Sequence, residues 1–344
     1  MEATTVEPWW RAAARLLTSL PVRLACTAIA VALLLHGVDA GAAMRSLGGV
    51  DFGWLLLAML LTAGGYALSV VEWGVLLRAA SPHARWLRIC SWQVQSVFMG
   101  SVVPGGAGGD ALRAVHAAGV AGAARGVASL ICSRMAGSCG MATWALLSAL
   151  LLHALFGWIT VAAAGVLVLL IAAGWLCAFT AAPLVARCSR HPLRLLRRGA
   201  SLAMPLTDAL HRFREHRDAV AMSVVAGVAG WSVNLLSLAA LAHSVGVDVG
   251  PQLFAVVMPL SLLTTLVPFA VSGIGLREGV LVGLLVHAGV APQKAGALAV
   301  LVDLQPLPVA LCGAWLWLTE RSAAATRRAA TAAPNLQGAA LGAG

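Results

Sequence analysis

Charged side chains are scarce in this chain. Only 10% of its 344 residues are Asp, Glu, Lys or Arg, whereas 60% are hydrophobic. A soluble fold of this size needs far more charge to cover its surface, so the shortage excludes a soluble globular protein and indicates a polytopic membrane protein. Acidic residues are scarcest, 13 against 23 basic residues. Because the basic residues gather between apolar spans, as in cytoplasmic loops, nucleic-acid binding is not expected.

Several chemical signatures are also missing. The seven cysteines include no Cys-x-x-Cys pair and lie mostly in apolar segments, so we expect them to be small buried hydrophobes. The nine histidines lack metal-ligand spacing. No nucleophile has a positioned base, and neither familiar nucleotide-binding glycine motif is complete. We therefore expect no metal, no cofactor and no enzymatic activity.

Long apolar segments predict an all-α membrane fold. At about twenty residues per crossing, six full spans are expected, over residues 22–39, 52–77, 126–153, 156–180, 219–244 and 295–318. The first is interpreted as a retained span, with a cleaved signal peptide as the alternative. Segments 90–121 and 252–290 each contain a Pro-Gly break between short apolar arms. Each is predicted to be a re-entrant helical hairpin. The alternative is that each segment crosses the membrane twice.

The arginine distribution predicts the topology. An arginine-rich linker and both termini are expected in the cytoplasm of a multi-pass inner (plasma) membrane protein. The re-entrant segments would then enter from opposite sides, and the two halves would run in opposite senses, as in inverted repeats. The linker is either an ordinary solvated loop or an amphipathic segment on anionic headgroups. The predicted parts are an N-terminal segment 1–21, a first membrane half 22–186, the linker 187–218, a second half 219–320 and a disordered tail 321–344.

The two breaks share an order of parts. Residues 103–113 read VPGGAGGDALR and residues 267–278 read VPFAVSGIGLRE. Downstream, Arg125 and Lys294 each begin an apolar segment, and nine residues further on each segment holds a lone charge, Arg134 or Asp303. Broken backbone at membrane depth is tolerated only where protein or a water-filled cavity covers its polar groups. Matched breaks therefore indicate a transporter binding site, with a coincidence of glycine-rich turns as the alternative.

Arginines close to both breaks predict an anion site. Each arginine should lie beside the exposed N-terminus of a half-helix, where free N–H groups and a planar guanidinium suit phosphate oxygens. The neighbouring acids, Asp110 and Glu278, are candidates for counter-ions, gates or proton-coupled carboxylates. The alternative for each is simple charge pairing with its arginine. An ion pair between Arg134 and Asp303, near the bilayer centre, is favoured over separate roles. The candidate substrate-binding residues are Asp110, Arg113, Arg134, Arg277, Glu278 and Asp303, with Gly106, Gly108, Gly109, Ser272, Gly273 and Gly275 at the breaks.

Other polar residues receive weaker interpretations. Glu72 is expected to snorkel toward the interface near the cytoplasmic end of its span. Asn234 is expected to join helices through a hydrogen bond. Two prolines should kink the last span, and the polar residues around the breaks are candidates for lining a cavity. The prolines are Pro306 and Pro308. The candidate lining residues are Gln95, Ser96, Ser101, Ser261, Thr264 and Thr265.

These motifs resemble the flippase-like membrane family named for the membrane region of lysylphosphatidylglycerol synthase. The likeness lies in residues 104–113, 125–134, 272–279 and 294–303. The resemblance implies a polytopic inner-membrane protein that handles phospholipids, isoprenoid-linked lipids or glycolipids, with movement between leaflets as its activity. Its multidomain relatives carry a soluble synthetase domain. Because nothing after the last span could be such a domain, lysyl transfer by this chain alone is not expected.

The leading hypothesis is a lipid translocase that binds an anionic headgroup at the two broken helices. One alternative is a secondary transporter of a small organic anion, using the same site without a lateral opening. Another is a non-transporting membrane partner of a lipid-modifying or glycosyltransferase enzyme.

Overall fold

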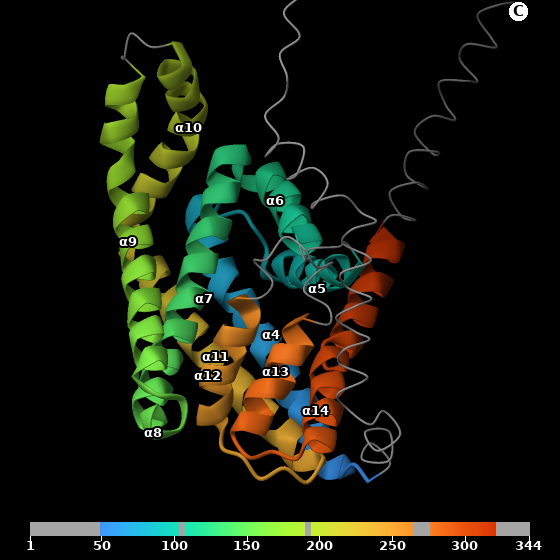
Figure 1. Cartoon of the computed structure of the whole chain (residues 1–344). Helices are drawn as coiled ribbons and strands as arrows, with labels where there is room; N and C mark the ends of the chain where they lie inside the picture. Colours follow the sequence, from blue (N-terminus) through green and yellow to red (C-terminus); the bar gives the residue numbers. More distant parts are fainter. Residues whose placement is uncertain (1–48, 103–106, 190–193, 264–275, 321–344) are drawn as a thin grey trace, which may run out of the picture.

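Long apolar helices form the body of the protein in a computed structural model that describes residues 49–102, 107–189, 194–263 and 276–320 (Figure 1). Five segments are long and apolar enough to span a membrane: α4 (Phe52–Ala80), α7 (Ala123–Leu151), α9 (Trp158–Cys188), α11 (Arg217–Ser244) and Pro292–Glu320. At 28 to 31 residues each, they extend over about 42–46 Å, more than a hydrocarbon core of about 30 Å. These five predicted spans are confirmed. The predicted span 22–39, the segment 1–21 and the tail 321–344 lie outside the described residues.

The last span is interrupted as the prolines predicted. Its first part, α14 (Pro292–Leu304), ends before a turn at residues 305–306, and the chain is helical again over residues 307–320. Proline lacks the N–H that would continue the helix, and its ring clashes with the preceding turn. The break therefore falls at Pro306.

Shorter helices flank each break. Helices α5 (Trp86–Val102) and α6 (Ala107–Ala121) lie on either side of the first break, and α12 (Pro251–Leu263) and α13 (Leu276–His287) flank the second. None reaches the length of about 20 residues that a crossing needs. Helix α6 lies in the upper part of the bundle as drawn in Figure 1, whereas α12 and α13 lie in the lower part. The helical arms are confirmed, and their re-entrant path stays a prediction.

The basic linker is more ordered than a solvated loop. It contains helix α10 (Arg194–Arg212) and the 3-10 turn η1 (Phe213–Glu215), and α10 lies alongside α9 in Figure 1. Ala209, Leu210 and Phe213 are buried with apolar residues of α4, α7 and α9. Helix α9 also runs two residues past the predicted boundary at 186. The amphipathic segment thus uses its apolar face to pack on the bundle. Between α7 and α9 stands the short helix α8 (His153–Phe156).

Helices α4 and α11 join the two predicted halves at the centre of the bundle. Ser237 Oγ donates a hydrogen bond to the Ala58 carbonyl (2.7 Å) and lies 2.9 Å from Thr62 Oγ1. Further along, Ser223 Oγ donates to the Glu72 carbonyl at 2.8 Å. Small hydroxyl residues allow close helix approach and hydrogen-bond across it, which is how helices associate where lipid supplies no hydrophobic drive.

A glycine contact brings α7 against α11. A Cβ placed on Gly140 would lie 2.6 Å from the Gly227 carbonyl oxygen, and a Cβ on Gly227 would lie 2.7 Å from the Ala136 carbonyl oxygen. Both obstacles are backbone atoms, which cannot move aside as a flexible side chain does. Glycine at these two positions is therefore a condition of the close α7–α11 crossing.

We predict that Gly140→Ala lowers the thermal unfolding midpoint of the purified protein in detergent. The added methyl group must push two backbones apart, and overpacking of this kind costs about 1–3 kcal/mol. Gly165→Ala on α9 is the matched control, because a Cβ there meets nothing within 4 Å. That control should melt at the wild-type temperature or slightly above, since alanine favours helix by about 1 kcal/mol over glycine. Equal midpoints for the two variants would contradict the proposed crossing.

Candidate functional site

A cavity of about 720 Å³ lies between helices of both halves. Its wall on α4 consists of residues at helical spacing, namely Thr62, Gly65, Tyr66, Ser69 and Glu72. A similar stripe on α11 comprises Gly227, Gly230, Trp231, Asn234 and Leu238. Residues three and four apart share one face of a helix. Polar and small side chains at this spacing therefore form continuous walls inside otherwise apolar spans.

Described residues that flank each break line this cavity. Gly100 and Ser101 near the end of α5, and Gly109 near the start of α6, line it beside the first break. Met258 and Leu262 line it near the end of α12, where the second break begins. The described ends of the two broken segments therefore meet a common space, as a binding site between them requires.

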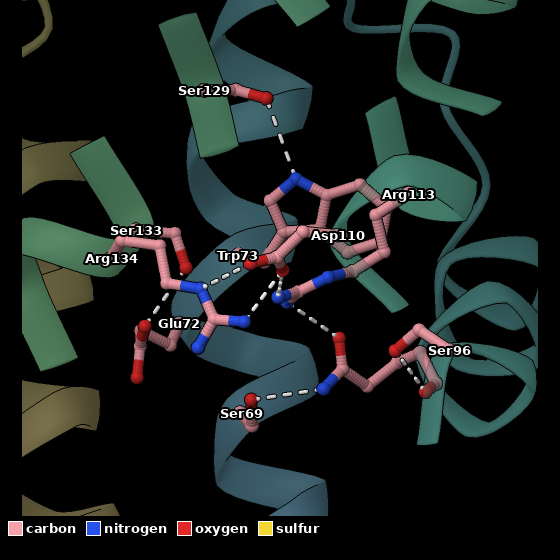
Figure 2. Close-up of polar contacts among 10 residues, drawn as sticks. Ser69, Glu72, Trp73, Ser96, Asp110, Arg113, Ser129, Ser133 and Arg134 are labelled. Atoms are coloured by element: carbon pink, nitrogen blue, oxygen red, sulfur yellow. Dashed lines mark hydrogen bonds and ion pairs between the residues drawn. The ribbon is translucent and has the colours of Figure 1, made fainter. Parts of the chain in front are cut away.

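Arg113 forms the floor of the cavity. Its side chain is only 7% exposed, and it forms an ion pair with Asp110 one helical turn earlier on α6. One of its terminal nitrogens donates to Gln93 Oε1 at 3.1 Å, and Gln93 Nε2 in turn donates to Ser69 Oγ at 3.1 Å. The guanidinium also lies over the Trp73 ring, 5.5 Å from its centroid. These contacts, several of which can be followed in Figure 2, hold a buried cation in one position.

Arg134 shares the same carboxylate. Its Nε donates to Asp110 Oδ2 at 3.1 Å and a terminal nitrogen donates to Asp110 Oδ1 at 2.5 Å, a two-pronged contact visible in Figure 2. The Arg134 side chain is 64% exposed and that of Asp110 is 44% exposed. Two arginines thus share one carboxylate, which leaves a net charge of +1 on the group. The favoured ion pair between Arg134 and Asp303 was wrong, because α6 presents Asp110 to α7 at this point.

The second motif forms a separate group of opposite sign. Arg277 Nε donates to Glu278 Oε1 at 3.1 Å, and Arg277 also forms an ion pair with Asp303 on α14. Here one arginine lies between two carboxylates, so these three residues together carry a charge of −1. None of the three is among the described residues that line the cavity. Asp110 and Glu278 thus form ion pairs with the neighbouring arginines, while their roles as counter-ions, gates or proton-coupled carboxylates stay predictions. Of the two arginines, Arg113 is among the described lining residues and Arg277 is not.

Arg125 and Lys294, the basic residues that precede these groups, make matching contacts. Arg125 donates to the Ala80 carbonyl at the end of α4 (3.5 Å), and Lys294 Nζ donates to the Gly246 carbonyl just after α11 (2.6 Å). Each cation satisfies a carbonyl at a helix C-terminus, where the helix dipole favours positive charge. The sequence parallel between the two motifs therefore extends to equivalent contacts, while the inverted-repeat relation itself stays a prediction.

The glycines of the first motif have a packing role. A Cβ on Gly109 would collide with the Ser96 carbonyl oxygen, so glycine here lets the start of α6 approach α5. Gly108 is buried beside it and is not among the described lining residues. The other predicted break residues, Gly106, Ser272, Gly273 and Gly275, lie outside the described residues, as do Thr264 and Thr265.

Several lining residues differ from the sequence interpretation. Glu72 faces the cavity, where its Oε1 accepts a hydrogen bond from Ser133 Oγ at 2.8 Å, and does not snorkel to the interface. On α5, Gln93 lines the cavity and Gln95 does not. Ser96 and Ser101 line it as expected, whereas Ser261 is not among the described lining residues. The spacing along the helix could have identified Gln93 from the sequence. Gln93 is three residues before Ser96 and therefore shares its face, whereas Gln95 lies on another face.

Comparison with known families places this chain in one of them. The profile described as the lysylphosphatidylglycerol synthase TM region matches residues 17–313. The chain belongs to this family. No curated protein and no solved structure matches the chain. All the described cavity residues fall within the matched region, so the cavity is a feature of the lysylphosphatidylglycerol synthase TM region in this protein.

We predict that Asp110→Asn destabilises the protein by about 1–3 kcal/mol, measured by thermal unfolding in detergent. The change removes the carboxylate between two arginines and leaves the Arg113 guanidinium buried without its ion-pair partner. Hydrogen bonds to charged groups contribute about 1.5–3 kcal/mol, and the 44% exposure of Asp110 reduces the loss. Asp248→Asn is the control, because that side chain is 98% exposed. If the unfolding midpoints of Asp110→Asn and Asp248→Asn were equal, the shared carboxylate would not stabilise the site.

Proposed function

We propose that this protein moves a lipid between the leaflets of a bacterial-type inner (plasma) membrane and holds its anionic headgroup between Arg113 and Arg134. The observation that carries the proposal is the pair of arginines sharing one carboxylate inside a cavity within a bundle of membrane-spanning helices. The surplus positive charge attracts an anion, and arginine presents the planar fork that matches phosphate oxygens. Membership of a family named for lipid synthesis supports a lipid as the cargo.

The exposure of the two arginines suggests how a headgroup would enter. Arg134 is 64% exposed and Arg113 is 7% exposed, so the former marks the mouth and the latter the floor. Arg134 follows the start of α7 at Ala123 by eleven residues, which corresponds to about 16 Å along the helix axis. A mouth at mid-helix depth would admit the headgroup from the side of the bundle. The hydrocarbon chains would then remain in lipid.

Binding would exchange partners at Arg134. The two-pronged contact with Asp110 is exposed, so a phosphate can take the place of the carboxylate without leaving a buried charge unpaired. Arg113 would keep Gln93 and Asp110 as partners throughout. Rocking of one half against the other about the α4–α11 contact would then expose the cavity to alternate sides.

No catalytic step is proposed for this chain. Modification of the lipid is instead assigned to a separate enzyme, either lipid-modifying or glycosyltransferase, which would act on the cargo before or after its movement. This division follows the sequence interpretation, which places no nucleophile beside a positioned base.

We predict that Arg134→Gln slows lipid movement by about tenfold or more. A lost charge-assisted hydrogen bond weakens binding by about 1.5–3 kcal/mol, and each 1.4 kcal/mol is a factor of ten. The measurement uses proteoliposomes containing phosphatidylglycerol labelled on its acyl chain, so that the headgroup is unaltered. Dithionite bleaches label in the outer leaflet, and further bleaching reports the arrival of lipid from the inner leaflet.

Arg198→Gln is the control variant, because Arg198 is exposed on α10 away from the cavity. It should move lipid at the wild-type rate. Wild-type movement in both Arg134→Gln and Arg113→Gln would exclude these arginines from the mechanism. Uptake of glycerol 3-phosphate without lipid movement would favour a transporter of small organic anions, and neither activity would favour a non-transporting partner.

A further inference from the structure

Glu72 is the charged cavity residue that an anion site leaves unexplained. The charged residues among the described cavity lining are Glu72, Asp110, Arg113 and Arg134. Asp110 pairs with both arginines, whereas Glu72 forms no ion pair with any residue that the structure describes. Its Oε1 accepts a hydrogen bond from the neutral Ser133 hydroxyl. A carboxylate thus faces the same space as the arginines without forming an ion pair with either of them.

The position of Glu72 on the cavity wall depends on the neighbouring helix. A Cβ on Gly137 of α7 would lie 3.2 Å from Glu72 Oε1 and 3.3 Å from Oε2, so glycine leaves room for the carboxylate. In the view of Figure 2, Glu72 and Asp110 lie on opposite sides of the Arg134 side chain. Glu72 of α4 therefore lines the same cavity as the arginines of α6 and α7, on the side of Arg134 away from Asp110.

Charge balance shows what this arrangement accommodates. The two arginines and two carboxylates of the described lining sum to zero, so a ligand with one phosphate and no other charge would bring the charge of this group and its ligand to −1. Uncompensated charge is costly at membrane depth, where little water is present to solvate it. A ligand that carries one ammonium beside its phosphate leaves the cavity neutral. It also supplies a direct ion-pair partner for Glu72, which has none among the described residues.

We infer that the lipid headgroup is zwitterionic, with its phosphate at Arg113 and Arg134 and a single ammonium group at Glu72. This inference rests on the proposed function and adds a second subsite to it. An ethanolamine phosphate headgroup has this composition, because a short carbon link separates its phosphate from its ammonium. A lysyl ester of phosphatidylglycerol carries two ammonium groups. One of them would find no further carboxylate among the described lining residues.

The test compares three acyl-chain-labelled lipids in the same proteoliposome assay: phosphatidylethanolamine, phosphatidylglycerol and lysylphosphatidylglycerol. The wild-type protein should move phosphatidylethanolamine about tenfold faster than either of the others, the effect of roughly 1.4 kcal/mol. Glu72→Gln should abolish this preference by slowing phosphatidylethanolamine alone. Glutamine keeps an oxygen that accepts from Ser133, so the variant should fold.

Two controls separate Glu72 from the rest of the site. Glu215→Gln, outside this cavity, should leave all rates unchanged. Arg134→Gln should slow phosphatidylethanolamine and phosphatidylglycerol by the same factor, because both lipids share the phosphate. An unchanged lipid preference in Glu72→Gln would overturn the inference, and so would fastest movement of lysylphosphatidylglycerol. Movement of phosphatidylglycerol that requires Glu72 and quickens at low pH, without any preference for ethanolamine, would also overturn it.

A binding measurement distinguishes failure of the inference from failure of the proposed function. Native mass spectrometry of the detergent-purified protein, with phosphatidylethanolamine and phosphatidylglycerol added in equal amounts, reports occupancy without movement. Preferred binding of phosphatidylethanolamine that disappears in Glu72→Gln supports the subsite even if no lipid crosses the membrane. Equal occupancy by the two lipids in the wild-type protein would overturn the subsite even if both are moved.

Discussion

The contact on which the cavity depends is the Asp110 carboxylate shared by Arg113 and Arg134. Lipid does not solvate a guanidinium, so each arginine needs partners supplied by the protein. Asp110 joins α6 to α7 through Arg134, and Gln93 and Ser69 extend the same network to α5 and α4. Because four helices contribute to one chain of polar contacts, their relative positions and the shape of the cavity are coupled.

The second motif repeats this design with the charges exchanged. Two arginines surround one carboxylate in the first group, whereas two carboxylates surround Arg277 in the second. The first group therefore carries surplus positive charge and the second surplus negative charge. Only the first lines the cavity among the described residues, so the proposed anion site lies in one half. The second group ties α13 to α14.

Close packing and open space are produced by the same kinds of residue in this bundle. Gly140, Gly227 and Gly109 allow backbones to touch, and hydroxyls on α4 and α11 hydrogen-bond across their contact. Gly109 and Gly227 also line the cavity, as do Gly137 and Gly230 one turn away from the α7–α11 contact. A small side chain lets a neighbour approach or leaves a hollow, depending on what lies opposite. A charged headgroup needs such a hollow next to rigid helices, so that its arginines are already in position when it arrives.

The sequence by itself determined the membrane class, five of the predicted spans, the two pairs of helical arms and the local pairing of Arg113 with Asp110. These follow from hydropathy, from helix-breaking prolines and glycines, and from neighbours a few residues apart, all of which are local properties. Only the tertiary structure decided that Arg134 meets Asp110 and not Asp303, that Glu72 and Gln93 face the cavity, and that Arg277 stands outside it. Those outcomes depend on the rotation of each helix and on where it crosses its neighbours. A rotation by a fraction of a turn, which barely changes the apolar pattern of a nearly uniform span, exchanges one polar partner for another.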